Sequence, residues 1–169
     1  KKLINLYFWY SKLNIMKKTF LLFLISIFFI NNTFSQLRTE FQLKQASKTV
    51  VNWLNNLNTE NYSLCYEEMS FQIKNNFDSI EMINLFSLEM ESFGEFLGRK
   101  EISRQFAANP IEFDERLSNF PDGYYAMFVF KTKYENWKLS EGLETLFLHQ
   151  DYKSRWRILD WITEFKSNE

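Results

Sequence analysis

The hydrophobic period of this chain changes about halfway along, and that change constrains its fold more than any other feature. Before Gly94, apolar residues recur at steps of three and four, as they do on one face of an α-helix. From Arg99 onward, long runs are rich in aromatic and β-branched residues, which is typical of strands. A block of helices followed by a block of strands predicts an α+β domain.

Three helices are predicted in the first block, at residues 40–56, residues 62–71, and from Asp78 to Gly94. In the third, Asp78 and Glu81 fit a capping box, and Gly94 suits the residue that follows a helix. The apolar stripe of the first helix is Leu43, Ala46, Val50, Trp53, Leu54 and Leu57. The stripe expected for the third is Ile80, Ile83, Phe86, Met90 and Phe93.

Four strands are predicted in the second block, at residues 99–107, 124–134, 139–149 and 156–165. Their short, polar connections predict an antiparallel meander, with the three N-terminal helices packed on one face of a curved sheet. The second strand has apolar residues on both faces. We therefore expect its outer face to be a partner surface if it is left uncovered.

The front of the chain has the pattern of a secretory signal. Met16 is followed by two lysines, an apolar run over residues 20–30, and a small residue, Ser35, before Gln36. The run is shorter than the about 20 residues that a membrane-spanning helix needs. We expect a signal peptide at 16–35, a single domain at 36–169, and bacterial secretion or a periplasmic location without a stable membrane anchor after cleavage. Residues 1–15 are interpreted as upstream sequence translated by mistake.

Charge and cysteine content exclude several classes of protein. The first 35 residues hold five lysines and no acid, which leaves 15 basic and 21 acidic residues after them, a net charge of −6. An acidic body has no electrostatic footprint for nucleic acid. The single Cys65 cannot form a disulfide within the chain. Because Cys65 and the single His149 lie in different predicted elements, no metal site is expected. No cofactor motif is found.

Several short motifs follow one another in an order that resembles a known family. They are Val51-Asn52-Trp53-Leu54, Tyr62-Ser63-Leu64-Cys65-Tyr66, Phe93-Gly94 leading to Arg99, Pro121-Asp122-Gly123-Tyr124-Tyr125, Glu144-Thr145-Leu146 and Trp156-Arg157-Ile158. The chain resembles the secreted bacterial family called domain of unknown function 4019, of the nuclear transport factor two-like (cystatin-like) cone fold. The resemblance implies a cone-shaped sheet and secretion, and it implies no particular chemistry.

Two acidic residues lie within apolar strand sequences. Asp160 is flanked by Ile158-Leu159 and Trp161-Ile162, and Glu144 lies between Leu143 and Leu146. An acid on the inner face of a sheet would have its pKa raised by burial and would act as a base. Strand alternation also allows the acids to face solvent. As a separate alternative, Arg99 pairs with Glu144 across the sheet as a structural ion pair. The candidate ligand-binding residues are Arg99, Glu144, Tyr66 and Asp160, and no catalytic residue is assigned.

These observations leave three hypotheses for function. The leading one is a secreted, non-catalytic domain that binds a small ligand or an envelope protein. The first alternative is a small acid–base enzyme, of isomerase or dehydratase type, with a carboxylate inside the cone. The second is a scaffolding subunit that forms a homodimer through the outer face of its sheet.

Overall fold

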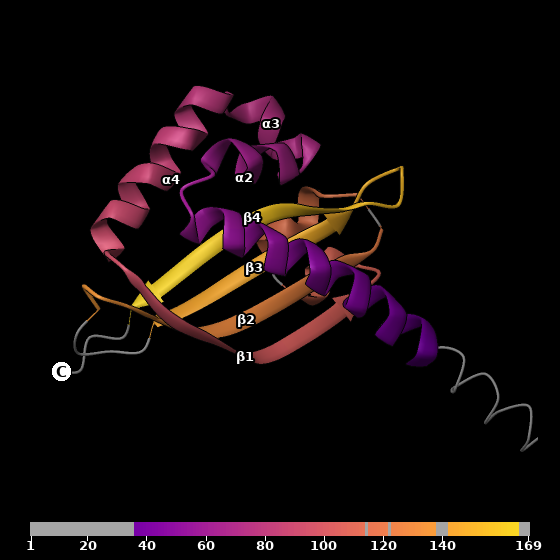
Figure 1. The fold of residues 1–169 in the computed structure, drawn as a ribbon. Helices are drawn as coiled ribbons and strands as arrows, with labels where there is room; N and C mark the ends of the chain where they lie inside the picture. Colours follow the sequence, from indigo (N-terminus) through magenta and orange to yellow (C-terminus); the bar gives the residue numbers. More distant parts are fainter. Residues whose placement is uncertain (1–35, 114, 122, 138–141, 166–169) are drawn as a thin grey trace, which may run out of the picture. The chain divides into compact units, whose positions relative to one another are not determined.

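The computed structural model describes residues 36–113, 115–121, 123–137 and 142–165 (Figure 1). The predicted signal peptide and the upstream segment lie outside the described residues. Within those ranges, none of the helices combines the length and the apolar character that crossing a membrane requires. The described residues after Phe41 belong to one compact unit.

The helices form the first half of that unit. Residues 36–58 are helical, and the part of this helix from Gln42 onward belongs to that unit. Helices α2 (Tyr62–Glu68), α3 (Phe71–Asn76) and α4 (Ser79–Phe93) follow. The six residues of the stripe predicted for the first helix are all buried, which confirms that stripe. The prediction of three helices is wrong, because the segment predicted as one helix at 62–71 is divided between α2 and α3.

The break between α2 and α3 is caused by a distant strand. Met69 and Ser70 are extended, and the backbone N–H of Ser70 donates to the carbonyl of Ile158 at 2.7 Å. The Ser70 hydroxyl also caps α3 by accepting from the N–H of Ile73. Leaving the helix therefore gives this segment a backbone partner on the sheet and gives α3 its cap.

Helix α4 begins and ends as predicted, but its buried face is rotated. Asp78 accepts a hydrogen bond from the N–H of Glu81 at 2.9 Å, and Gly94 follows the helix with a φ of 76°. The buried residues are Met82, Phe86, Met90 and Phe93. Ile80 lies about 120° around the helix from Phe86, and its exposure of 71% corrects its place in the predicted stripe.

Four antiparallel strands form an open sheet in the order β1-β2-β3-β4, which confirms the meander. The strands are β1 (Phe96–Ala107), β2 (Tyr125–Tyr134), β3 (Gly142–Gln150) and β4 (Trp156–Phe165). Two short 3-10 helices, η1 (Pro110–Glu112) and η2 (Glu115–Asn119), connect β1 to β2. The helices α2 to α4 lie on one side of the sheet (Figure 1).

Apolar residues are buried on both faces of the sheet. On the helical side, Phe128, Phe130, Leu146, Leu148 and Ile158 join the buried residues of the helices in the main core. On the other side, a smaller cluster is formed by Tyr125, Phe147 and Leu159, with Phe113 and Phe120 of the β1–β2 connection packed against it. The β1–β2 connection therefore covers part of the outer face of the sheet, which was expected to be a partner surface if it was left uncovered.

A bulge in β4 changes which residues face the helices. Leu148 pairs with Ile158, but its neighbour Phe147 pairs with Asp160, so Leu159 is an extra residue. After the bulge, Trp161 lies opposite Leu146 on the helical side, whereas Asp160 is exposed. Regular alternation from Ile158 would have given the opposite orientation.

Candidate functional site

A buried carboxylate, that of Glu144, lies on the helical side of the sheet. Glu144 is the third residue of β3 and is 0% exposed. The cross-strand register brings Arg99 of β1 opposite Thr132 of β2, and Thr132 opposite Gly142, two residues before Glu144. Because residues two apart on a strand share a face, these side chains converge on one point between the sheet and the helices.

Four donors surround the Glu144 carboxylate. Oε2 accepts hydrogen bonds from Arg99 Nε at 2.5 Å and from the Thr132 hydroxyl. Oε1 accepts from the Tyr134 hydroxyl at 3.2 Å and from the Trp161 indole N–H at 3.3 Å. A carboxylate has about four lone-pair directions, so this one is saturated. We call Arg99, Thr132, Tyr134, Glu144 and Trp161 the carboxylate cluster.

Tyr134 connects the two charged groups of the carboxylate cluster. Its hydroxyl accepts from Arg99 Nη2 at 3.1 Å and donates to Glu144. Its ring contacts Phe93, Phe96 and Trp137, with centroids 4.7–5.7 Å apart. Burial, and then the charge of Glu144, raise the pKa of the Tyr134 hydroxyl. The phenol therefore stays protonated and acts as a donor to the carboxylate.

The geometry of the carboxylate cluster is that of a structural ion pair. Only 9% of the Arg99 side chain is exposed. The ion pair between Arg99 and Glu144, one of the alternatives that the sequence left open, is formed. A general base needs a free lone pair within reach of a substrate proton. Here the protein's own donors occupy both carboxylate oxygens, so the cluster is arranged to hold β1, β2, β3 and β4 together.

The other two candidate residues lie away from the carboxylate cluster. Asp160 is exposed, and its carboxylate accepts from the neighbouring N–H of Trp161 at 2.9 Å. Tyr66 is in α2, where its hydroxyl donates to the carbonyl of Phe77 at 3.2 Å and Lys74 lies over its ring. The structure therefore brings together Arg99 and Glu144 and leaves Tyr66 and Asp160 in other places.

Sequence reasoning missed three members of the carboxylate cluster. Thr132 and Tyr134 continue the alternation of the core residues Phe128 and Phe130, and this period of two was a usable signal. Trp161 gave no such signal, because the bulge at Leu159 reverses the face that the sequence pattern assigns to it.

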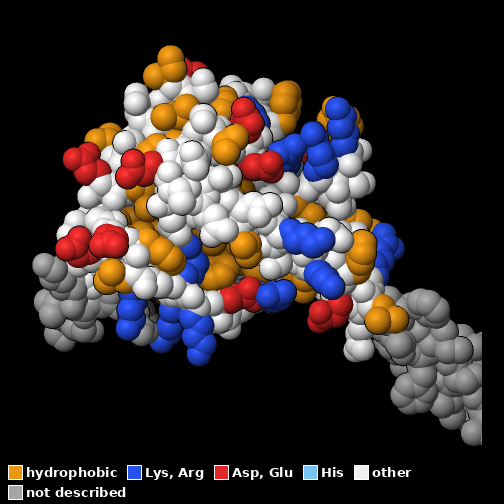
Figure 2. Space-filling model, in the orientation of Figure 1, with side chains coloured by type: hydrophobic (Ala, Val, Ile, Leu, Met, Phe, Trp, Pro, Cys, Tyr) orange, Lys and Arg blue, Asp and Glu red, His pale blue; other side chains and the backbone are white. Residues whose placement is uncertain are grey.

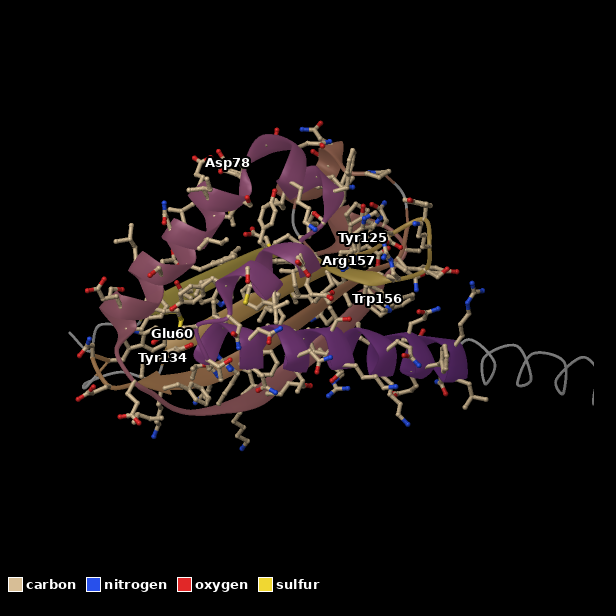
Figure 3. All side chains as sticks on the ribbon, turned by 45° about the horizontal axis from the view of Figure 1, so that its top comes forward. Glu60, Asp78, Tyr125, Tyr134, Trp156 and Arg157 are labelled. Atoms are coloured by element: carbon tan, nitrogen blue, oxygen red, sulfur yellow. The ribbon has the colours of Figure 1, made fainter. Side chains whose placement is uncertain are left out.

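A hollow lies between the first helix and the β3–β4 hairpin. Its volume is about 320 Å³, and we call it the helix–hairpin hollow. It is lined by Gln45, Lys48, Thr49, Asn52, Glu68, Ser154, Arg155, Trp156 and Arg157. Figure 3 labels Trp156 and Arg157 beside the first helix, apart from Tyr134 of the carboxylate cluster. The hollow and the carboxylate cluster are therefore separate places.

Asp151 fixes the hairpin side of the hollow. One of its oxygens accepts from the N–H groups of Lys153 and Arg155, both at 2.9 Å. The other oxygen pairs with the Arg155 guanidinium at 2.8 Å and with Arg157 Nε at 3.6 Å. Burial pushes the Asp151 pKa upward, but the hydrogen bonds from Arg155 and Lys153 outweigh it and leave the pKa below its usual range.

A second hollow, of about 440 Å³, adjoins the first. It is lined by Lys44, Ser47, Lys48, Val51, Asn52 and Arg104, so the two hollows share Lys48 and Asn52. In Figure 2, Lys and Arg side chains gather in this part of the visible face, over the first helix and the hairpin. The openings in this surface are therefore bordered by basic side chains, in a chain whose net charge is −1.

Cys65 and His149 are both held in packed environments. Cys65 is fully buried, and burial raises the pKa of its thiol to about 12. His149 is half-buried and stacks on Tyr125 with centroids 4.7 Å apart. In the part of the chain that the structure describes, no group of three or more His, Cys, Asp or Glu residues could hold a metal ion.

Comparison with known proteins identifies the family. No curated protein and no solved structure matches the chain. One family model, described as "Protein of unknown function (DUF4019)", matches residues 49–161, which is more than half of the chain and contains the whole carboxylate cluster. The chain therefore belongs to the DUF4019 family.

Proposed function

We propose that this protein is a secreted or periplasmic bacterial domain that binds a small ligand without transforming it. The ligand would occupy the helix–hairpin hollow, and the carboxylate cluster would be part of the framework. The proposal includes a cone-like, nuclear transport factor two-like curvature of the sheet. The open antiparallel sheet with helices on one side supports that likeness.

The observation that carries the proposal is the saturation of Glu144. The acid–base alternative places this carboxylate, or Asp160, against a bound substrate. Glu144 accepts from four protein donors, and Asp160 is exposed and bonded to its own neighbouring backbone. Catalysis by Glu144 would require the loss of several hydrogen bonds in the core before any proton moved. Binding therefore fits the arrangement better than catalysis.

A protein partner is a second candidate, because apolar side chains are exposed on the helices. Phe71 is 73% exposed, Ile80 71% and Leu88 64%. They lie on α3 and α4, and Figure 2 shows hydrophobic side chains in this region. Exposed large apolar residues on neighbouring elements are typical of surfaces that bind other proteins. This surface would serve an envelope partner without involving the hollow.

Ligand binding can be tested by screening the purified protein against small metabolites by heteronuclear NMR. We expect at least one compound to shift the backbone resonances of Lys48, Thr49 and Ser154, which line the hollow, and to be recovered chemically unchanged. Thr49→Trp, which places a large ring in the hollow, should abolish the shifts. The matched control is Ser87→Trp on the exposed side of α4, which should retain them. Conversion of the compound by the protein would overturn the non-catalytic proposal.

The proposed location has its own test. We expect expression of the full chain in a bacterial host to yield a mature protein in the periplasm or medium whose first residue is Gln36. N-terminal sequencing and intact mass measure this directly. Recovery of an uncleaved chain in the cytoplasm would contradict it.

A further inference from the structure

We infer that the helix–hairpin hollow binds an anionic group, a carboxylate or a phosphate of a small molecule, between Lys48 and Arg155. This inference rests on the proposed function and names the chemical class of its ligand. It is carried by the charge of the lining, by one buried donor without a partner, and by the rigidity of the hairpin.

The charge of the lining is predominantly positive. Lys48 projects from the first helix, Arg155 from the loop before β4, and Arg157 from β4. Among the lining residues, Glu68 is the single carboxylate. Glu68 is paired with Arg157 at 2.9 Å. The two arginines also act on Lys74, whose pKa is lowered by burial first and then by the charge of Arg157. The region therefore has cationic groups on two opposing elements.

Trp156 supplies a polar group that lacks a partner. Trp156 is one of the residues that line the hollow, and it is 4% exposed. Its indole N–H is buried and has no hydrogen-bond partner in the described structure. A buried donor without an acceptor costs free energy. An anion entering beside the ring would offer the indole an acceptor after a small movement of the side chain.

The hairpin holds its cations in place before any ligand arrives. Asp151 binds Arg155 through one oxygen and the loop backbone through the other, and the N–H of Asp151 donates to the carbonyl of Arg155 at 2.8 Å. The Arg155 side chain remains 53% exposed, so part of its guanidinium is open to solvent. A preorganised donor loses little conformational freedom on binding. Asp151 reduces the local charge, but it is not part of the lining.

The test uses inorganic phosphate and acetate as probes, titrated into the full protein with sodium chloride at matched ionic strength as the control. The readout is the indole ¹H–¹⁵N resonance of Trp156, assigned with Trp156→Phe. We expect a saturable shift with at least one of the two anions and none with chloride. Phosphate alone or acetate alone would identify which anionic group the site takes.

Two matched variants locate the binding. Lys48→Gln should weaken binding of the effective anion about tenfold, as expected for the loss of one charge-assisted hydrogen bond. Lys100→Gln removes an exposed lysine from β1, outside the hollow, and should leave the affinity unchanged. Equal affinities of the Lys48→Gln and Lys100→Gln variants would overturn the assignment, as would the absence of any saturable shift of Trp156.

The same experiment separates this inference from the proposed function. If a neutral compound from the metabolite screen shifts the hollow resonances while both anions fail, the anion inference is wrong and the binding proposal stands. If neither the anions nor any screened compound shifts those resonances, both are wrong.

Discussion

Glu144 shows how much one buried residue organises. Its carboxylate, on β3, accepts hydrogen bonds from side chains of the other three strands, β1, β2 and β4. A buried ion pair adds little net stability compared with apolar residues of the same size, because both charges lose their hydration. Removing one partner is different, since the remaining charge is then buried without compensation. Loss of either Arg99 or Glu144 is therefore expected to destabilise the fold more than loss of both.

Glu144→Gln should lower the free energy of unfolding by about 3–5 kcal/mol, the usual cost of breaking a buried ion pair from one side. Arg99 keeps its charge in the variant, and the new amide group turns a donor toward groups that are themselves donors. Urea denaturation measures the change. Glu91→Gln, on the exposed side of α4, is the matched control and should stay within about 0.5 kcal/mol of the parent.

A double variant tests whether the uncompensated charge of Arg99 causes the loss of stability. Adding Arg99→Met to Glu144→Gln removes the uncompensated charge, so the double variant should be more stable than Glu144→Gln alone. If the single variant matched the Glu91→Gln control, the ion pair would not be what holds this region.

Among the elements, α4 depends on its two ends. Gly94 has φ 76° and ψ −159°, a combination open almost only to glycine. An added Cβ would also lie 2.9 Å from Asn136 Nδ2, which donates to the carbonyl of Ser92. The turn from α4 into β1 therefore needs glycine for two independent reasons.

Gly94→Ala should cost about 1–3 kcal/mol of stability through the backbone conformation alone. Gly98→Ala in β1 is the matched control, because no heavy atom beyond its own chain neighbours lies within 4 Å of its added Cβ. We expect it to be neutral in the same urea denaturation experiment. Equal stability of the two alanine variants would show that the turn adapts to a side chain.

The elements also show what the sequence could predict. Both ends of α4 were predictable, because a capping aspartate and a C-terminal glycine act on backbone within a few residues. The break between α2 and α3 was not, since it depends on Ile158, nearly ninety residues away. The bulge at Leu159 was not predictable for the same reason. It depends on the register between β3 and β4, and the sequence of β4 alone does not reveal it.

For the whole molecule, the α+β class followed from the change in hydrophobic period, the meander from the short connections between strands, and the Arg99–Glu144 pair from cross-strand reasoning. The helix–hairpin hollow did not, because it joins residues of the first helix to a hairpin about a hundred residues later. Tyr66 and Asp160 were reasonable candidates by residue type. Their positions depend on tertiary packing and on the bulge, which the sequence pattern does not contain.

Global stability should fall in acid partly through His149. Burial lowers the pKa of this imidazole below its ordinary value near 6.5, more than the nearby Asp151 raises it. A depressed pKa in the folded state contributes stability above the unfolded pKa, and this contribution is lost as pH falls through the folded pKa. NMR titration of the chain's single histidine should therefore give a midpoint below 6.5.

The matched variant for this prediction is His149→Gln. It should weaken the dependence of the unfolding free energy on pH between about 6.5 and the folded midpoint, while the carboxylates continue to titrate at lower pH. A midpoint at or above 6.5 in the folded protein would contradict the buried, stacked position of the ring.

The extra residue in β4 has a consequence for how related sequences are compared. Leu159 shifts the alternation of β4 by one residue. Before it, Trp156 and Ile158 face the helices, and after it the next residue that faces them is Trp161. A relative shortened by this one residue would keep an indole above the carboxylate with a regular strand. The spacing between Trp161 and Glu144 across the sheet, rather than the spacing along β4, is what such a comparison should hold fixed.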